Sequence, residues 1–99
     1  MSMRKVSEKQ EQRNRLVSEI KKSLPDSCCI CGRRGVDAAH ILPKSIYPEY
    51  YTEPWNIIPL CREHHVLFDA DRNFRREQTK LIEIVKEHDE LAANRHFGL

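Results

Sequence analysis

At 99 residues the chain is long enough for one domain, and its 39% hydrophobic and 32% charged residues are ordinary for a protein with a solvated surface. No apolar run approaches the roughly 20 residues of a transmembrane helix, so we expect no membrane span. The formal net charge is only +2, but residues 1–24 carry seven Lys or Arg against three Glu, whereas the remainder sums to −2.

Residues 3–24 are predicted to form a helical arm. Apolar side chains recur at helical spacing in its second half, from Leu16 to Leu24, and Pro25 ends it. Its cationic side chains fit either contact with a phosphate backbone or a solvated helix face, and both interpretations stay open. The first nine residues are charged and lack an apolar stretch, so we expect no secretory signal and a reducing, cytoplasmic location.

Two pairs of metal-binding residue types flank the middle of the chain. Cys28 and Cys31 form a Cys-x-x-Cys pair in a predicted tight turn, and Cys61 and His64 form a Cys-x-x-His pair. Four such ligands in two pairs match the tetrahedral preference of structural Zn²⁺. Disulfide bonds are the alternative, but they would leave the interleaved histidines unexplained. Cys29 is then either a small buried thiol or an alternative ligand to Cys28.

Between these pairs the sequence predicts two short strands joined by a long loop. Residues 36–42 form the first strand, with His40 near its end, and Asn56 introduces the second strand, which ends at Cys61. The connecting residues 43–55 contain three prolines and four aromatic residues. Aromatic side chains at that density pack or bind, so we expect an ordered loop and not a flexible linker.

Helical segments follow the second strand, one over residues 62–68 and one over residues 77–94. A two-stranded hairpin with one helix buries too little surface to be stable alone, so a metal ion and flanking helices are needed. We therefore predict a single α+β domain over residues 1–99, with a zinc-clamped core over residues 28–70.

Three blocks in this core resemble the motifs of HNH endonucleases. The blocks are residues 38–43 (Ala-Ala-His-Ile-Leu-Pro), residues 56–61 (Asn-Ile-Ile-Pro-Leu-Cys) and Cys61-x-x-His64-His65, and the resemblance covers about residues 28–70. It implies a ββα-metal (His-Me finger) core, a structural zinc knuckle and one catalytic divalent cation (Mg²⁺, Mn²⁺, Ni²⁺ or Zn²⁺). The implied activity is hydrolysis of phosphodiester bonds in DNA or RNA.

The resemblance also implies roles for individual residues. His40 stands where the family has its general base, and a neutral imidazole can accept a proton from attacking water. Asn56 either holds the loop and orients His40 or serves only as a turn residue. His64 and His65 project about 100° apart on a helix, so His64 is assigned to zinc and His65 to the catalytic cation.

The remaining ligands of the catalytic cation are less regular. Asp69 lies four residues after His65, at a spacing from which a carboxylate could reach the same ion, although a helix cap or an ion pair is the alternative. Many family members have Asp or His directly before the general base, but Ala39 occupies that position here. Asp37 lies two residues earlier on the same strand face and is a candidate substitute.

We predict a metal-dependent endonuclease that nicks DNA or cleaves it with low sequence specificity. The alternative is a non-catalytic zinc module of the same fold that binds nucleic acid or protein, which Ala39 favours. The oligomeric state stays open. The candidate phosphate contacts are Arg33, Arg34, Lys44, Arg62, Arg72, Arg75 and Arg76.

Overall fold

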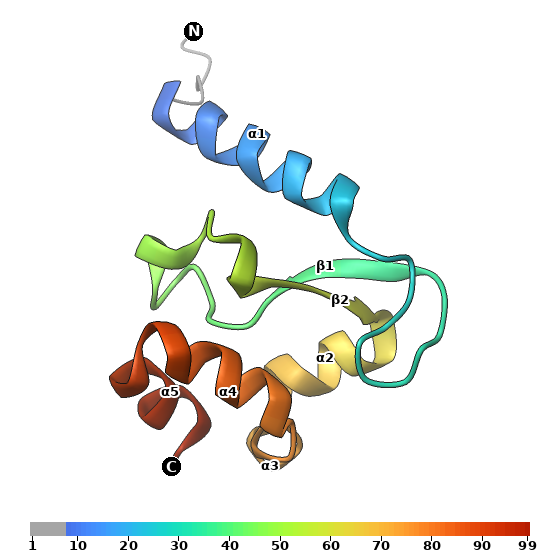
Figure 1. The fold of residues 1–99 in the computed structure, drawn as a ribbon, viewed down its shortest axis with the longest axis vertical. Coiled ribbons are helices and arrows are strands. Elements are labelled where there is room, and N and C mark those ends of the chain that lie inside the picture. Colours follow the sequence, from blue (N-terminus) through green and yellow to red (C-terminus); the bar gives the residue numbers. More distant parts are fainter. Residues whose placement is uncertain (1–7) are drawn as a thin grey trace, which may run out of the picture.

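The computed structural model describes residues 8–99 and has a two-stranded antiparallel sheet at its centre (Figure 1). Strand β1 (Val36–His40) pairs with strand β2 (Ile57–Cys61), with Val36 opposite Cys61 and His40 opposite Ile57. Helix α2 (Arg62–Ala70) begins directly after β2 and runs back beside the sheet. The chain is thus a small α+β protein, as predicted.

The first strand is two residues shorter than predicted because the Asn56 side chain, and not a backbone partner, accepts the hydrogen bond from Leu42. The predicted strand extended to Leu42, but regular pairing ends at His40. The Ile41 N–H donates to the backbone oxygen of Asn56 (2.8 Å), and the Leu42 N–H donates to the Asn56 side-chain oxygen (2.8 Å). The chain then leaves the sheet and enters the aromatic loop.

The aromatic loop between the strands is held by contacts with the C-terminal helices. It contains two 3-10 turns, Pro48–Tyr50 and Pro54–Asn56, each with proline at its start. Trp55 stacks on His88 with ring centroids 4.4 Å apart, and the Tyr50 hydroxyl donates a hydrogen bond to Asp89. The expectation of an ordered, packed loop is therefore confirmed.

The prediction of one continuous helix over residues 77–94 is wrong. This region contains helices α4 (Thr79–His88) and α5 (Glu90–Phe97), preceded by the short helix α3 (Arg72–Arg76). Asp89 breaks the helix because its backbone is extended and its side chain caps α5, accepting from the Ala92 N–H at 3.0 Å. Gly98 ends α5 in the left-handed conformation that favours glycine.

The hydrophobic core lies where the sheet, α2 and the α4–α5 pair meet. Its largest fully buried apolar side chains are Phe68, Phe97, Ile41, Leu42, Leu60 and Val85. Phe68 and Phe97 meet edge to face with centroids 6.2 Å apart, which joins α2 to α5. The C-terminal helices are therefore an integral part of the core.

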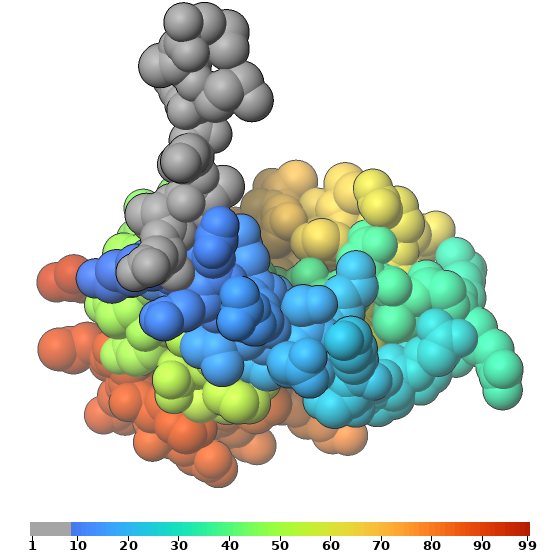
Figure 2. Space-filling view, turned by 90° about the horizontal axis from the view of Figure 1, so that it is seen from above, coloured from blue at the N-terminus to red at the C-terminus, as the bar shows by residue number. Residues whose placement is uncertain are grey.

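Helix α1 (Glu8–Ser23) lies on the side of the sheet opposite to α2 (Figure 1). Seen from that side, it runs across the middle of the molecule (Figure 2). Val17 and Ile20 are half-buried, whereas Leu16 is 53% exposed. The part of the predicted arm before Glu8 lies outside the described residues. No helix in residues 8–99 has the length and apolarity to cross a membrane.

We expect the Tyr50–Asp89 hydrogen bond to stabilise the fold at neutral pH and to lose this effect at strongly alkaline pH. The Asp89 carboxylate accepts from the phenol and raises the pKa of Tyr50 to about 12, above the ordinary value of about 10. Because the folded-state pKa is raised, this stability is complete below about pH 10 and is lost as the pH rises toward 12. Urea titrations of Tyr50→Phe should give a lower midpoint at pH 8 and a shallower loss between pH 10 and 12.

Tyr47→Phe is the matched control, because the Tyr47 ring lies beside Tyr50 but makes no hydrogen bond to Asp89. It should keep the alkaline loss of the original protein. An equal pH profile for Tyr50→Phe and the unsubstituted protein would contradict the assignment.

Candidate metal centre and histidine cavity

Cys28, Cys31, Cys61 and His64 form one compact cluster, as their spacing predicted. Their ligand atoms all lie within 4.8 Å of one another. The His64 Nδ1 atom is 3.6 Å from the Cys28 sulfur and 3.4 Å from the Cys61 sulfur, and the Cys31 and Cys61 sulfurs are 3.8 Å apart. Two sulfurs that each lie about 2.3 Å from a tetrahedral zinc ion are roughly 3.8 Å apart. The cluster can therefore bind zinc.

The Cys-x-x-Cys turn is fixed to the end of the sheet by backbone hydrogen bonds. The Gly32 N–H donates to the Cys28 oxygen (2.8 Å), and Gly32 adopts a φ of 77°, which glycine tolerates. The Cys29 N–H donates to the Pro59 oxygen on β2 (2.9 Å). These bonds place the first ligand pair beside Cys61. The Cys29 side chain is exposed and outside the cluster, which corrects its assignment as a buried thiol or zinc ligand.

The Cys28 and Cys31 thiols differ in pKa when no cation is present. Burial alone would raise the pKa of Cys28, but backbone N–H groups and the His64 ring lower it to about 6. The Arg33 N–H favours the Cys31 thiolate, but burial and the sulfurs of Cys28 and Cys61 outweigh it and raise the pKa of Cys31. Three thiolates this close repel one another, so a cation is the natural means of ionising all of them.

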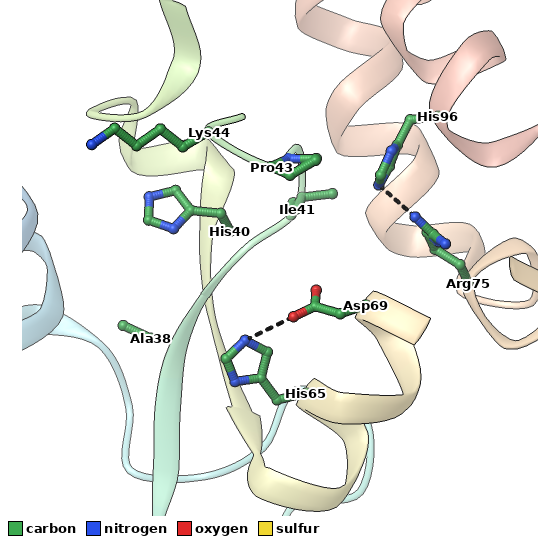
Figure 3. A pocket seen from close by; sticks show the side chains of 9 residues that line it. All are labelled: Ala38, His40, Ile41, Pro43, Lys44, His65, Asp69, Arg75 and His96. Atoms are coloured by element: carbon green, nitrogen blue, oxygen red, sulfur yellow. Dashed lines mark hydrogen bonds and ion pairs between the residues drawn. The ribbon is translucent and has the colours of Figure 1, made fainter. Parts of the chain in front are cut away.

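A cavity of about 360 Å³ lies beside β1 and α2, lined by His40 from the strand and by His65 and Asp69 from the helix (Figure 3). Its polar lining comes from β1, the loop, α2, α3 and α5, and consists of His40, Lys44, His65, Asp69, Arg75 and His96. His40 and His65, both predicted as site residues, thus line the same cavity. His96 was not among the predicted site residues, because only the folded C-terminus brings it there.

The His40 ring is oriented by the aromatic loop. Its Nε2 atom is 2.9 Å from the backbone oxygen of Tyr51, and its ring stacks on the Tyr51 ring with centroids 4.9 Å apart. A carbonyl oxygen only accepts hydrogen bonds, so Nε2 is the protonated nitrogen of the neutral ring. Nδ1 consequently carries the lone pair and can accept a proton.

Asn56 ties the end of β1 to this loop. It is fully buried, and its side-chain nitrogen donates to the backbone oxygens of Leu42 and Tyr50, each at 3.1 Å. Its side-chain oxygen accepts from the Leu42 N–H. Because Leu42 follows His40 by two residues and Tyr50 precedes Tyr51, one amide fixes the two segments that form the His40–Tyr51 hydrogen bond.

The His65 ring lies between two carboxylates. Its Nδ1 atom is 2.9 Å from Asp37, and its Nε2 atom is 3.4 Å from Asp69. The hydrogen bond from His65 lowers the pKa of Asp37, so Asp37 is ionised at neutral pH. Asp37 and Asp69 therefore contact opposite nitrogens of the His65 ring. Among residues 8–99, the Cys3His cluster is the one group in which three or more potential metal ligands lie close together.

The predicted phosphate contacts fall into different environments. Arg62 is 2.9 Å from Asp37, and Arg33 is 3.8 Å from Glu63, so both have carboxylate partners. Lys44 lines the cavity with its ammonium group 4.4 Å from the centre of the Tyr51 ring. Arg34, Arg72 and Arg76 are exposed outside the cavity, whereas Arg75 lines it.

The structure is a small α+β protein with a two-stranded sheet followed by a helix, a Cys3His cluster that could bind zinc, and a cavity lined by His40 and His65. Residues 28–72 match the family model described as HNH endonuclease. This segment is 45 of the 99 residues, and over it the chain is similar to HNH endonucleases. No curated protein and no solved structure matches the chain.

We expect Cys61→Ser to abolish zinc binding and folding together. A structural zinc site supplies roughly 10–16 kcal/mol apparent, which is comparable to the roughly 5–15 kcal/mol that keeps a typical domain folded. Elemental analysis should find one zinc per original chain and none in Cys61→Ser, whose circular dichroism should be that of an unfolded protein. Cys29→Ser, with its exposed side chain outside the cluster, is the control and should keep the zinc. Full zinc content in folded Cys61→Ser would show that the ligand set is wrong.

We expect Asn56→Ala to destabilise the fold by about 3 kcal/mol or more, because each buried backbone group that it leaves unpaired costs about 1–3 kcal/mol. Urea unfolding measures the change. Asn73→Ala, at an exposed position on α3, is the control and should shift the midpoint little. A change below 1 kcal/mol in Asn56→Ala would mean that water replaces the amide.

Proposed function

We propose that this chain is a metal-dependent endonuclease that hydrolyses phosphodiester bonds of DNA, with β1, β2 and α2 as its ββα-metal core. The single observation that carries the proposal is that His40 and His65 line one cavity, where His40 Nε2 is hydrogen-bonded to the Tyr51 carbonyl oxygen. This leaves His40 Nδ1 as a base inside the cavity, as the family resemblance leads us to expect. RNA is the second candidate substrate.

The donor set around His65 fits a divalent cation. The Nδ1–H of His65 donates to Asp37, so Nε2 keeps a lone pair on the side of Asp69. A carboxylate behind a ligating imidazole fixes its tautomer and raises its basicity. We propose that His65 and Asp69 hold the cation, with Asp37 as a positioning residue. When bound, such a cation polarises a phosphoryl oxygen and stabilises the leaving oxygen.

In this mechanism His40 Nδ1 removes a proton from the attacking water, and the Nε2–H bond to Tyr51 keeps the ring in the required tautomer. Asn56 acts as a positioning residue through the loop that carries Tyr51.

The chain has one such cavity among its described residues, which supports nicking of one strand at a time. The thiols are unpaired by disulfides, which supports a reducing, cytoplasmic location.

The second candidate is a non-catalytic zinc module of the same fold. The observation that favours it is Ala39, which is 1% exposed and offers no ligand at the position where many family members have one. Such a module would bind nucleic acid or protein without hydrolysis, so a cleavage assay separates the two candidates.

We expect the zinc-loaded protein to convert supercoiled plasmid to the nicked form when Mg²⁺, Mn²⁺ or Ni²⁺ is added. His40→Ala should lower the rate about 10²–10⁴-fold, the contribution of a general base, and His65→Ala should remain folded and lose activity. The rate is measured by gel electrophoresis of time points. Lys86→Ala, at an exposed position on α4 outside the cavity lining, is the control and should cut at the original rate. Plasmid that survives every cation, or equal cutting by His40→Ala, would contradict nuclease function.

A further inference from the structure

Arg75 and His96 close the cavity on the side away from His40 and Lys44 (Figure 3). Arg75 comes from α3 and His96 from α5, so both lie on the C-terminal helices. The Arg75 Nη1 atom is 3.2 Å from His96 Nε2. A guanidinium group only donates hydrogen bonds, so His96 Nε2 accepts and the His96 ring is neutral.

The partner of Arg75 is therefore a neutral ring and not a carboxylate. Burial and the charge of Arg75 lower the pKa of His96 to about 4, so the ring stays neutral at pH 7. Within residues 8–99, no carboxylate lies within 4.0 Å of Arg75, in contrast to Arg62 and Arg33. Asp69 is the acidic side chain in the cavity lining, and it contacts His65.

The Arg75 side chain is also incompletely hydrogen-bonded. Its Nε atom is buried and has no acceptor among the described residues, although buried guanidinium donors are normally paired. The Arg75 guanidinium group is thus a positive charge that contacts a neutral ring, has an unpaired donor and borders a cavity. Such a group is suited to bind an anion with several oxygens. A phosphodiester offers this charge and these acceptors, and arginine recognises its oxygens well.

We propose that Arg75 binds a backbone phosphate of the nucleic acid within this cavity, and that His96 is a positioning residue that holds Arg75 without neutralising it. The inference rests on the proposed function and deepens it, because it names the group that receives the substrate opposite His40. The cavity then has Lys44 on one side and Arg75 on the other, with the His65–Asp69 pair between them.

Binding of a fluorescein-labelled DNA duplex, followed by anisotropy, tests this directly. The protein is the zinc-loaded full chain carrying His40→Ala, with no other divalent cation added, so no cleavage intervenes. Adding Arg75→Gln should weaken binding about tenfold or more, as expected for loss of a charged hydrogen bond. It should also reduce the slope of log affinity against log salt by about one.

Arg95→Gln is the matched control, because Arg95 is the exposed neighbour of His96 on α5 and lies outside the cavity lining. It should weaken binding less than threefold. Zinc content and thermal unfolding confirm that each variant is folded. Equal effects of Arg75→Gln and Arg95→Gln, or no duplex binding by the parent, would overturn the proposal.

Substitutions of His96 test its positioning role. His96→Gln keeps a side-chain acceptor and should retain most of the affinity, whereas His96→Asp supplies an anion and should weaken binding as much as Arg75→Gln. Equal affinities for these two variants would overturn the positioning role. If the chain binds DNA through Arg75 but never nicks plasmid, the nuclease proposal fails alone; if it nicks plasmid and Arg75→Gln changes neither binding nor rate, the phosphate site fails alone.

Discussion

The pairing of β1 with β2 is the constraint on which both sites depend. Its register places Cys61 opposite Val36, at the end of the sheet where the Cys-x-x-Cys turn is bonded to β2, and places His40 at the other end. A slip of one residue would turn every strand side chain to the opposite face. Because α2 begins directly after Cys61, the same register delivers His64 to the sulfurs and His65, about 100° further round the helix, to β1.

A second set of contacts connects the histidine cavity to the C-terminal helices. His40 is held by the Tyr51 carbonyl, the loop carrying Tyr51 is held by Asn56, and the loop is fixed to α4 and α5 through Trp55–His88 and Tyr50–Asp89. The family match covers residues 28–72 and so ends before these helices. Helices α4 and α5 nevertheless support the loop, and α3 and α5 contribute Arg75 and His96 to the cavity wall. The cavity lining therefore extends beyond the segment that matches the family model.

The sequence predicted the features that depend on short-range spacing. Two ligand pairs at fixed separations were enough to identify the Cys3His cluster, because zinc restricts both ligand type and geometry. The strands and α2 followed from apolar runs bounded by turn residues. The break at Asp89 was missed because the apolar face continues from Val85 to Ala92, and only the capping of Ala92 and the bond from Tyr50 show why the chain turns there. His96 entered the cavity wall through long-range packing, which no local pattern records.

Many HNH endonucleases have a metal-binding Asp or His where this chain has Ala39, and the position of Asp37 shows how a nearby carboxylate is placed instead. Ala39 and Asp37 share one strand face, but Ala39 is buried in the core whereas the Asp37 carboxylate reaches His65 Nδ1. At position 39, where many members of the family that the chain resembles have a direct ligand of the cation, this chain thus has a buried alanine. In the proposed mechanism, Asp37 instead acts through its contact with His65 Nδ1, which leaves Nε2 of the imidazole for the cation. The Asp37 carboxylate would therefore act on a cation held by His65 and Asp69 through the His65 ring, and not as a ligand itself.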